Sequence, residues 1–501
     1  MCGIAGAYGQ SRPDEGRRML RRLEHRGPDD EGEVRLGRSW LGHTRLAIVD
    51  LESGRQPLAT PEGELWLVGN GEIYNHEEVR SALGSAEYST RSDNEVALQL
   101  LARRGPRALG ELEGMFALLA ADHNGGFVAA RDPVGIKPLY WAQGGRGVHF
   151  ASEMAAFEKD LQDRVEVFPP GCYWTPRAGR ERFGAAVPRT GDEGQAAQAG
   201  SERDQTRDVL VASVRRQMMG DVPVGVFLSG GLDSTLVAAI AARMLAERGE
   251  RLQTFAVGTE GSADLLAARA AADHLGTDHH ERVYTPEEAL GAVAVAVRTI
   301  EHFDPSLVRS AVPNYLLAQM TARHVKVVLT GEGADELFAG YEYLRDFSRP
   351  EQLHDEIVRT VEGLHNLNLQ RCDRVTMAHG LEARVPFLDR EVIAFALRLP
   401  PESKLSGPGR PEKQLLREAF TGWLPDELLW REKSQFGDGS GAAEVLTTAM
   451  EQSISETEFE HERGAVYPPL RTREELAYFR IFRDHLPGVR PEQTVGRFAT
   501  A

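Results

Sequence analysis

A hexapeptide that directly follows an apolar run constrains the fold of this chain more than any other segment. Residues 224–228 lead into Ser229-Gly230-Gly231-Leu232-Asp233-Ser234, and a strongly helical stretch covers 236–247. Two glycines let the backbone approach a phosphate closely, so N–H groups and the helix N-terminus can hold an anion. Asp233 is placed to hold Mg²⁺ on a pyrophosphate. The alternative is a tight strand–helix turn that Asp233 merely caps, but the complete hexapeptide after an apolar strand favours the phosphate site.

A second loop occupies a similar position after another apolar run. Residues 325–329 precede Thr330-Gly331-Glu332-Gly333-Ala334-Asp335-Glu336. With 254–257, these runs flanked by helices predict a parallel sheet covered on both faces, which binds ligands at its carboxyl edge. Asp233 and Asp335 could share the metal ions that neutralise a triphosphate, leaving Glu332 for proton transfer or for ordering an acceptor. A solvated acidic loop is the alternative, but two glycines directly after a buried strand argue against it.

Length and composition predict two domains. A chain of 501 residues is too long for one hydrophobic core. Short β-like runs near the N-terminus alternate with helical segments, which fits an α+β domain of stacked layers; the strands are 66–68, 116–119 and 127–130, and the helices are 77–83 and 94–103. Residues 188–205 are rich in Gly, Ala, Gln and Ser and are typical of a linker. We expect domains at 2–187 and 206–465 and a polar C-terminal tail at 466–501.

The N-terminus carries a candidate nucleophile. Cys2 follows Met1, so removal of Met1 leaves a thiol and a free α-amine on one residue. An amine with a reference pKa of about 8 can accept the thiol proton near neutral pH, so Cys2 is expected to become catalytic only after that removal. Cys172 and Cys372 are too scattered for a disulfide framework or a zinc cluster, and we expect both to be core thiols.

Composition and charge exclude several classes of protein. Apolar residues make up 41% and charged residues 27% of the chain, as in a globular protein. A formal net charge of −17 disfavours nonspecific nucleic-acid binding, and the sequence has no basic stripe with interleaved aromatic residues. No apolar run approaches the ~20 residues of a membrane span, and arginines at positions 17, 18, 21 and 22 rule out a signal peptide. We expect a cytoplasmic protein that binds neither nucleic acid nor membrane.

Several further motifs, in a fixed order, resemble one enzyme family. They are Met1-Cys2-Gly3-Ile4, His25-Arg26-Gly27-Pro28-Asp29, Arg45-Leu46-Ala47-Ile48-Val49-Asp50, Asn70-Gly71-Glu72-Ile73-Tyr74-Asn75, Ser92-Asp93, the run 131–140, Glu382-Ala383-Arg384-Val385-Pro386-Phe387-Leu388-Asp389 and Arg431-Glu432-Lys433-Ser434-Gln435-Phe436. Together with the two loops they resemble glutamine-hydrolysing asparagine synthetase, a class II glutamine amidotransferase joined to an ATP pyrophosphatase-type synthetase domain. The resemblance implies a four-layer αββα N-terminal-nucleophile hydrolase fold followed by an α/β domain with a parallel sheet.

The resemblance implies a glutaminase site in the first domain. The implied residues are Cys2 as the nucleophile, Asn70 and the backbone N–H of Gly71 as oxyanion donors, Arg45 for the substrate carboxylate, and Glu72 and Asp93 for its α-amino group. Their chemistry agrees with these roles. An oxyanion needs fixed neutral donors, a carboxylate suits a guanidinium fork, and an ammonium suits carboxylates.

In the second domain the resemblance implies that Mg-ATP adenylates a carboxylate and that ammonia, arriving through an internal passage, displaces AMP. The implied residues are Ser229, Gly230, Gly231, Asp233 and Ser234 for the pyrophosphate, Val257, Gly331 and Tyr341 around the adenosine, Asp233 and Asp335 for the metal, and Glu332 and Lys433 in catalysis. Without the resemblance, Lys433 would be interpreted as a surface lysine. Adenylation supplies the leaving group that a free carboxylate lacks, and a dry passage keeps ammonia unprotonated.

The acceptor is where this chain departs from the bacterial family members. Where they carry Thr-Thr-Ile-Arg along the aspartate site, this chain has Ser306-Leu307-Val308-Arg309, which keeps one hydroxyl and Arg309. The segment 342–347 also differs. We expect amidation of aspartate to asparagine; the alternative is a related amide synthetase that acts on another carboxylic acid.

Two other interpretations are weaker. Relatives that form β-lactams typically lack the N-terminal cysteine. A non-catalytic binding protein would be expected to lose some of the key residues, and Cys2, Asn70, Asp233 and Lys433 are all present. The family suggests a homodimer, which the residues themselves do not indicate.

Overall fold

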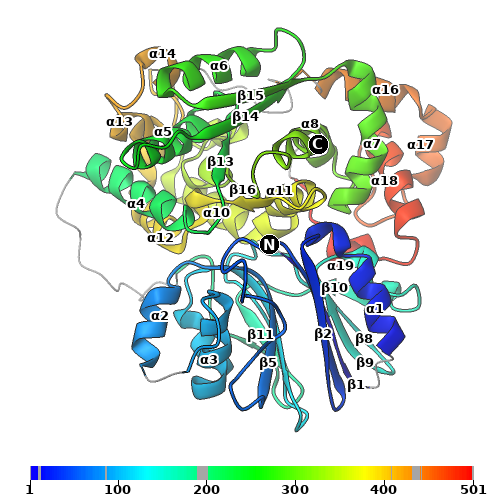
Figure 1. Ribbon diagram of the computed structural model, residues 1–501. Coiled ribbons are helices and arrows are strands. Elements are labelled where there is room, and N and C mark those ends of the chain that lie inside the picture. Colours follow the sequence, from blue (N-terminus) through cyan, green and yellow to red (C-terminus); the bar gives the residue numbers. More distant parts are fainter. Residues whose placement is uncertain are drawn as a thin grey trace.

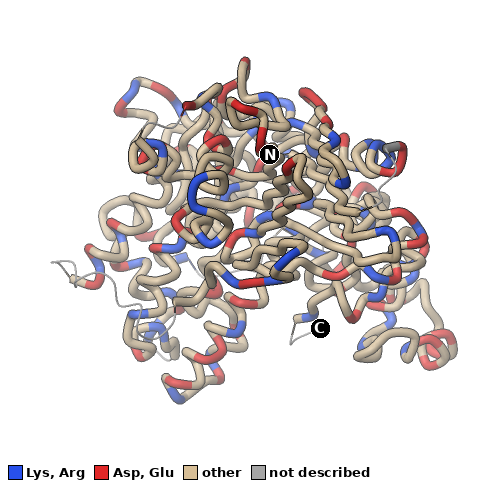
Figure 2. The backbone as a smooth tube through the Cα atoms, turned by 90° about the horizontal axis from the view of Figure 1, so that it is seen from below, with Lys and Arg blue, Asp and Glu red and all other residues tan. Residues whose placement is uncertain are grey.

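The computed structural model describes residues 2–9, 13–84, 87–188, 201–407, 409–431, 440–441 and 443–498. An N-terminal domain built on two antiparallel sheets meets a C-terminal domain built on one parallel sheet (Figure 1). Strand β1 (Cys2–Gly9) begins at the junction of the two domains, so its first residue faces the boundary (Figure 1). Lys and Arg residues are interspersed with Asp and Glu along both domains (Figure 2). Among the described residues, no helix combines the length and the apolar character needed to cross a bilayer.

The N-terminal domain has the four-layer αββα arrangement. Its two six-stranded sheets have the orders β10-β8-β9-β1-β3-β2 and β12-β11-β7-β6-β5-β4, and all neighbouring strands are antiparallel. Successive side chains of β6 point to opposite faces of its sheet, which explains the layers. Leu119 packs between the two sheets with Ile4, while Leu118 packs on the outer face with Leu98 of α3. On the far side, Met19 of α1 packs with Trp40 of β3. Each sheet is therefore covered by helix on its outer face.

The bounds of the N-terminal elements are as follows. The strands are β2 (Asp30–Leu36), β3 (Ser39–Arg45), β4 (Leu58–Ala59), β5 (Leu65–Ile73), β6 (Gly114–Asp122), β7 (Phe127–Arg131), β8 (Tyr140–Gly144), β9 (Gly147–Ala151), β10 (Val165–Val167), β11 (Cys172–Thr175) and β12 (Gly179–Arg182). The α-helices are α1 (Pro13–Arg21), α2 (His76–Leu83) and α3 (Asn94–Arg104). The strands predicted at 66–68, 116–119 and 127–130 are confirmed as parts of β5, β6 and β7, and both predicted helices are confirmed.

The C-terminal domain is an α/β domain with a five-stranded parallel sheet in the order β15-β14-β13-β16-β17. The chain runs from β13 (Val224–Phe227) to β14 (Gln253–Gly258) and β15 (Asp278–Val283), then returns to the other side of β13 with β16 (Val327–Leu329) and β17 (Glu382–Arg384). The strand order therefore reverses between β13 and β16. The loops after these two strands flank the reversal, which is where open α/β sheets bind ligands.

Helices enclose this sheet (Figure 1). The α-helices are α4 (Glu202–Gln217), α5 (Leu232–Ala246), α6 (Ala263–Leu275), α7 (Pro286–Ile300), α8 (Pro305–Thr321), α9 (Ala334–Leu337), α10 (Pro350–Gly363), α11 (Asn368–Met377), α12 (Arg390–Arg398), α13 (Gln414–Ala419), α14 (Asp426–Leu429), α16 (Ala443–Gln452), α17 (Glu456–Glu462), α18 (Arg473–His485) and α19 (Pro491–Thr494). Helix α5 starts four residues earlier than the predicted 236–247, because the hexapeptide itself forms its first turn.

The segment beyond residue 465 contains a buried helix, although its composition predicts a polar tail. In α18, Leu476, Phe479 and Phe482 recur at helical spacing and are buried, and both phenylalanine rings contact Phe303. Arg480 alone interrupts the apolar run 476–482, but the segments on both sides of it are polar or contain proline, so the average composition beyond residue 465 does not predict a buried helix. Residues 189–200 of the expected linker lie outside the described residues.

Candidate functional site

Cys2 lies at the start of a central strand of the first sheet. Strands β1 and β3 pair antiparallel with Cys2 opposite Arg45. The Cys2 N–H donates to Asn70 Oδ1 at 3.1 Å, and the Cys2 carbonyl accepts from Arg26 Nε at 3.2 Å. Burial raises the pKa of the Cys2 thiol. A base is therefore needed beside the thiol before it can act as a nucleophile near neutral pH.

The expected oxyanion donor Asn70 is held with one hydrogen-bonding group available. The residue is fully buried on β5, and its Nδ2 has no hydrogen-bond partner among the described residues. Next to it, Gly71 has φ of +140°, and a Cβ there would lie 1.9 Å from the Met115 carbonyl oxygen. Only glycine fits this position without displacing β6. An unpaired buried N–H is costly unless it meets an acceptor, so Asn70 is preorganised for one.

The two expected ammonium-binding carboxylates are buried near the same strand. Asp93 Oδ2 accepts from the Ile73 N–H at 2.7 Å, and Glu72 Oε2 lies 3.7 Å from Arg384 Nη2. Burial raises the pKa of Asp93 and of Glu72, the latter well above its usual range. Arg384 belongs to β17 of the C-terminal domain and also contacts Glu382 Oε1 at 2.5 Å. The sequence analysis gave Arg384 no role.

Arg45, expected to bind a carboxylate, supports the loop that follows it. Its Nη2 donates to the Asp50 carbonyl at 2.6 Å and its Nη1 to the Leu51 carbonyl at 3.3 Å. Its Nη2 also donates to the Val49 carbonyl at 3.4 Å, so two further N–H groups of the guanidinium remain for a ligand. The structure thus brings Cys2 and Arg45 together at the ends of two paired strands, and Asn70 of β5 in the facing sheet is hydrogen-bonded to Cys2.

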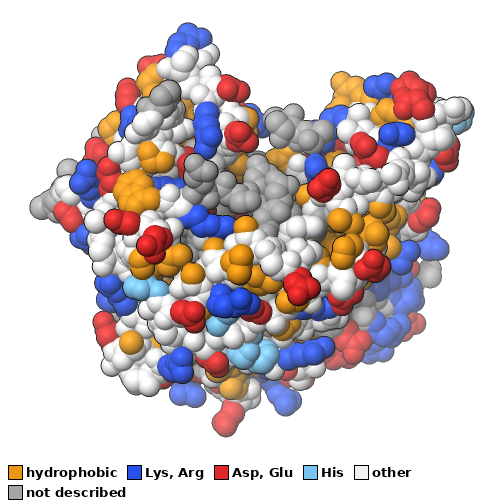
Figure 3. Space-filling view, turned by 90° about the horizontal axis from the view of Figure 1, so that it is seen from above, with side chains coloured by type: hydrophobic (Ala, Val, Ile, Leu, Met, Phe, Trp, Pro, Cys, Tyr) orange, Lys and Arg blue, Asp and Glu red, His pale blue; other side chains and the backbone are white. Residues whose placement is uncertain are grey.

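A cavity of about 680 Å³ lies at the carboxyl edge of the parallel sheet. The predicted residues that line it are Ser229, Gly231, Asp233, Ser234, Ser306, Arg309, Gly331, Glu332, Asp335 and Tyr341. The face of the domain seen from above is hollowed between two raised regions (Figure 3). Val257 is buried within β14 and is not part of the lining among the described residues. Lys433 lies outside the described residues, so its role stays a prediction.

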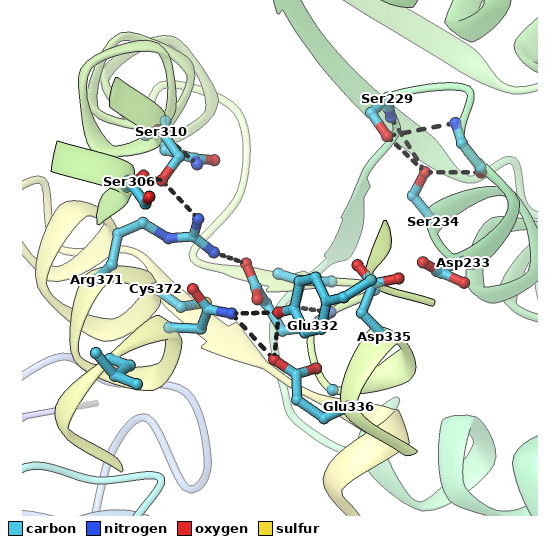
Figure 4. A pocket seen from close by; sticks show the side chains of 18 of the residues that line it. Ser229, Asp233, Ser234, Ser306, Ser310, Glu332, Asp335, Glu336, Arg371 and Cys372 are labelled. Carbon is cyan, nitrogen blue, oxygen red and sulfur yellow. Dashed lines mark hydrogen bonds and ion pairs between the residues drawn. The ribbon is translucent and has the colours of Figure 1, made fainter. Parts of the chain in front are cut away.

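The loop after β13 is shaped for a close approach to a ligand. Gly230 has φ of +71°, and a Cβ there would lie 2.4 Å from the backbone of Ala267. Ser229 Oγ and Ser234 Oγ are 3.0 Å apart, which fixes the turn (Figure 4). Arg431 Nη1 donates to the Gly230 carbonyl at 3.0 Å. Gly230 is therefore required by the packing of the turn against α6.

The two acidic residues that were assigned to the metal converge on one cation, Lys413. Its Nζ lies 2.6 Å from Asp233 Oδ2 and 2.5 Å from Asp335 Oδ1. These two charges raise the pKa of Lys413 despite its burial. Two carboxylates that meet at one point form the oxygen donor set that Mg²⁺ prefers. Sequence reasoning missed Lys413 because it is distant from both loops along the chain.

The opposite wall of the cavity contains a second group of charges. Arg371 of α11 donates to Ser310 Oγ at 2.8 Å and pairs with Glu332 (Figure 4). Burial raises the pKa of Glu332. Arg309 Nε, one turn along α8 from Ser306, lies 3.7 Å from Glu474 Oε1 of α18. Arg371 and Glu474 were also missed, because no local pattern distinguishes them from ordinary helical charges.

Comparison with known proteins covers nearly the whole chain. Residues 1–170 match the family model described as Glutamine amidotransferase domain, and 205–352 and 345–488 match that described as Asparagine synthase. A probable asparagine synthetase [glutamine-hydrolyzing] of Schizosaccharomyces pombe is 38% identical, over 97% of this chain and 93% of that protein. The asparagine synthetase [glutamine-hydrolyzing] of Asparagus officinalis is 41% identical, over 88% and 78%. Asparagine synthetase B [glutamine-hydrolyzing] of Escherichia coli is 37% identical, over 94% and 87%.

Proposed function

This chain belongs to the family of glutamine-hydrolysing asparagine synthetases, and from that premise we propose which of its residues carry out the reaction. The enzyme converts aspartate to asparagine with ATP and the amide nitrogen of glutamine, forming glutamate, AMP and pyrophosphate. The observation that carries the proposal is that one chain holds both halves of this chemistry. A buried Cys2 contacts Asn70 in one domain, and a cavity with a phosphate-type loop and Arg309 lies in the other.

In the N-terminal domain, Cys2 Sγ attacks the side-chain amide carbon of glutamine. After Met1 is removed, the α-amine of Cys2 takes the thiol proton and then gives it to the departing ammonia. Asn70 Nδ2 and the Gly71 N–H hold the negative oxygen of the tetrahedral intermediate. Water then hydrolyses the thioester to glutamate and restores Cys2. The free Nδ2 of buried Asn70 supports this assignment.

The substrate's other groups are held by the residues around this centre. Arg45 binds the α-carboxylate of glutamine through the N–H groups that the loop carbonyls leave available. Glu72 and Asp93 bind its α-ammonium group, and that new charge lowers the pKa that burial has raised on both carboxyls. Binding of glutamine therefore compensates two costly buried acids.

In the C-terminal domain, a carboxylate oxygen of aspartate attacks the α-phosphorus of ATP, and pyrophosphate leaves. Ammonia then attacks the acyl carbon, loses a proton, and AMP departs with the carboxylate oxygen. The N–H groups and hydroxyls of the loop from Ser229 to Ser234 hold the pyrophosphate, with Lys413 and Lys433 supplying positive charge. Gly331 and Tyr341, which line the cavity, lie around the adenosine, whereas Val257 is buried within β14 and does not reach the lining. Glu332, held by Arg371, takes the proton from the attacking ammonia.

Asp233 and Asp335, the two carboxylates that contact Lys413, would hold Mg²⁺, which would supply charge neutralisation for the departing pyrophosphate. Ser306 and Arg309 bind the acceptor, and their position at the start of α8 supports aspartate, because the guanidinium suits its second carboxylate. We propose domain limits of 2–187 and 206–465, a linker at 188–205, a C-terminal segment at 466–501, and a homodimer.

The test is a steady-state assay of the processed protein with glutamine, Mg-ATP and aspartate. Asparagine and AMP should form in equal amounts. The Cys2→Ala variant should lose activity with glutamine and keep it with ammonium chloride, since only the first domain is changed. Absence of asparagine with either nitrogen source would exclude the proposed function, and equal loss of both activities in Cys2→Ala would exclude two separate sites.

A further inference from the structure

Helix α11 lies between the two sites and is buried along its whole length. All of its residues from Asn368 to Met377 are buried. Its Arg371 reaches the cavity, where it holds Glu332 and Ser310. Asp373, two residues on, points away from that face, because successive residues of an α-helix turn by about 100°. The helix therefore presents a charge to each of the two domains.

Asp373 contacts the residue that holds the nucleophile. Arg26 Nη2 donates to Asp373 Oδ2 at 2.9 Å, and Arg26 Nε donates to the Cys2 carbonyl at 3.2 Å. The third edge of the same guanidinium donates from Nη1 to Glu153 Oε1 at 2.8 Å. Arg26 has no exposed surface and Asp373 only 4%. One fully buried guanidinium thus joins Cys2 of the first domain to α11 of the second.

A second ion pair fixes the same helix to the same domain. Arg374 Nη1 lies 2.8 Å from Glu153 Oε1, and its Nη2 lies 2.9 Å from Glu301 Oε2. Glu301 also accepts from the backbone N–H groups of Met154 and Ala155. These contacts tie α11 to the loop around Glu153. In a close-packed interior, a shift of such a helix must move its charged partners with it.

We propose that α11 couples the two sites and that Asp373 is the positioning residue through which it acts on Cys2. This inference rests on the proposed function. Entry of an acceptor carboxylate and its adenylation change the charge that Arg371 and Glu332 face. The helix transmits that change, and Asp373 sets how Arg26 holds the Cys2 carbonyl and so the direction of the thiol. Glutamine is then hydrolysed fastest when an acceptor is loaded, and ammonia is not wasted.

The test compares Asp373→Asn with a control at the same boundary. Lys326 Nζ forms an ion pair with Asp29 Oδ2 at 2.7 Å, also between the domains but away from α11, so Lys326→Gln is the matched variant. Asp373→Asn should lower kcat/KM for glutamine about tenfold, the effect of losing one charged hydrogen bond on Arg26. Asparagine formation from ammonia should stay unchanged in both variants. Mg-ATP with aspartate should accelerate glutamine hydrolysis in the wild type and in Lys326→Gln but not in Asp373→Asn.

Three results would overturn the inference while leaving the function intact. In the first, Asp373→Asn behaves like Lys326→Gln. In the second, Asp373→Asn loses ammonia-dependent synthesis in parallel with glutamine hydrolysis. In the third, Mg-ATP with aspartate does not change the rate at which the wild type hydrolyses glutamine. A wild type that makes no asparagine from ammonia would refute the proposed function instead.

A measurement on the unaltered enzyme covers the case in which Asp373→Asn does not fold. Mg-ATP with aspartate should slow amide hydrogen exchange in β1 and in residues 24–28 as well as in α11, and leave α2 of the same domain unchanged. Protection confined to the C-terminal domain would overturn the coupling.

Discussion

Asn70 illustrates how much of the proposed chemistry depends on one atom. Its Oδ1 accepts from the Cys2 N–H, which turns the Nδ2 group toward the space where no described residue accepts from it. The cost of leaving that donor unpaired in the free enzyme is recovered when an oxyanion forms. In the proposed mechanism the side chain therefore stabilises the transition state more than the bound substrate.

Asn70→Ala should lower kcat for glutamine hydrolysis by about 10²–10³-fold, as removal of one oxyanion donor does elsewhere, with a small change in KM. Asparagine formation from ammonia should not change, because the C-terminal cavity is untouched. Paired assays with glutamine and with ammonium chloride measure both effects. A variant that loses the two activities together would show that Asn70 is structural.

The residues that sequence analysis found and those it missed differ in one physical respect. Asp233 and Asp335 lie in glycine-containing loops directly after strands, so their local context predicts a ligand site. Lys413, which contacts both carboxylates, precedes a short helix and has no such context. Its role follows from a contact between segments 180 residues apart, which a single sequence does not encode locally.

At the scale of elements, helix α18 is the main feature that composition did not predict. The strands before both ligand loops were predicted because continuous apolar runs are typical of parallel sheets. In α18 the apolar run 476–482 is short, contains Arg480 and lies in an otherwise polar segment, and its burial depends on packing against α7, α8 and α16. Through Glu474, which lies 3.7 Å from Arg309, this helix supports a residue that lines the cavity.

We expect Glu474→Gln to raise KM for aspartate about fivefold, the equivalent of about 1 kcal/mol of lost orientation at Arg309. The amide oxygen introduced by this substitution can still accept hydrogen bonds from Tyr478 and Thr447, which in the wild type donate to Glu474 Oε1 at 3.0 and 3.3 Å. The helix should therefore stay in place. The measurement is KM for aspartate with ammonia as the nitrogen source. Glutamine hydrolysis serves as the control, and a rise in KM for ATP of the same size would contradict a role specific to the acceptor.

At the scale of the whole molecule, the boundary between the domains combines an apolar cluster that includes residues of both domains with groups of buried charges. Arg26, Glu153, Asp373 and Arg374 form one connected group there, with Arg384 and Glu72 a second. Hydrophobic patterning predicts cores and not such boundaries, so the two-domain order was predictable while the docking of the domains was not. Removal of one partner of a buried ion pair strongly destabilises the protein, because the other charge stays buried without its partner. These pairs therefore specify how the two domains dock.

Buried histidines in both domains should each lower the stability of the protein on mild acidification, while buried acids with a raised pKa, such as Glu72, contribute with the opposite sign. Burial lowers the pKa of His43 in the first domain and of His302 in the second to about 3. Both rings are neutral when folded, whereas the unfolded chain binds protons below its ordinary pKa of about 6.5. Protonation of each ring in the unfolded chain therefore lowers the free energy of unfolding as the pH falls from about 6.5 toward 3. The loss is about 2 kcal/mol per ring at pH 5.

His302→Asn tests this at one ring. Asparagine Oδ1 can replace the Nδ1 that accepts from the Asp304 N–H at 3.0 Å, so the start of α8 keeps its hydrogen bond. The variant should be less stable than wild type at pH 7.5 because it packs less well, and this deficit should shrink by about 2 kcal/mol at pH 5 because asparagine has no proton to gain. Urea unfolding at both pH values measures the difference. An equal deficit for His302→Asn at both pH values would contradict a buried neutral ring.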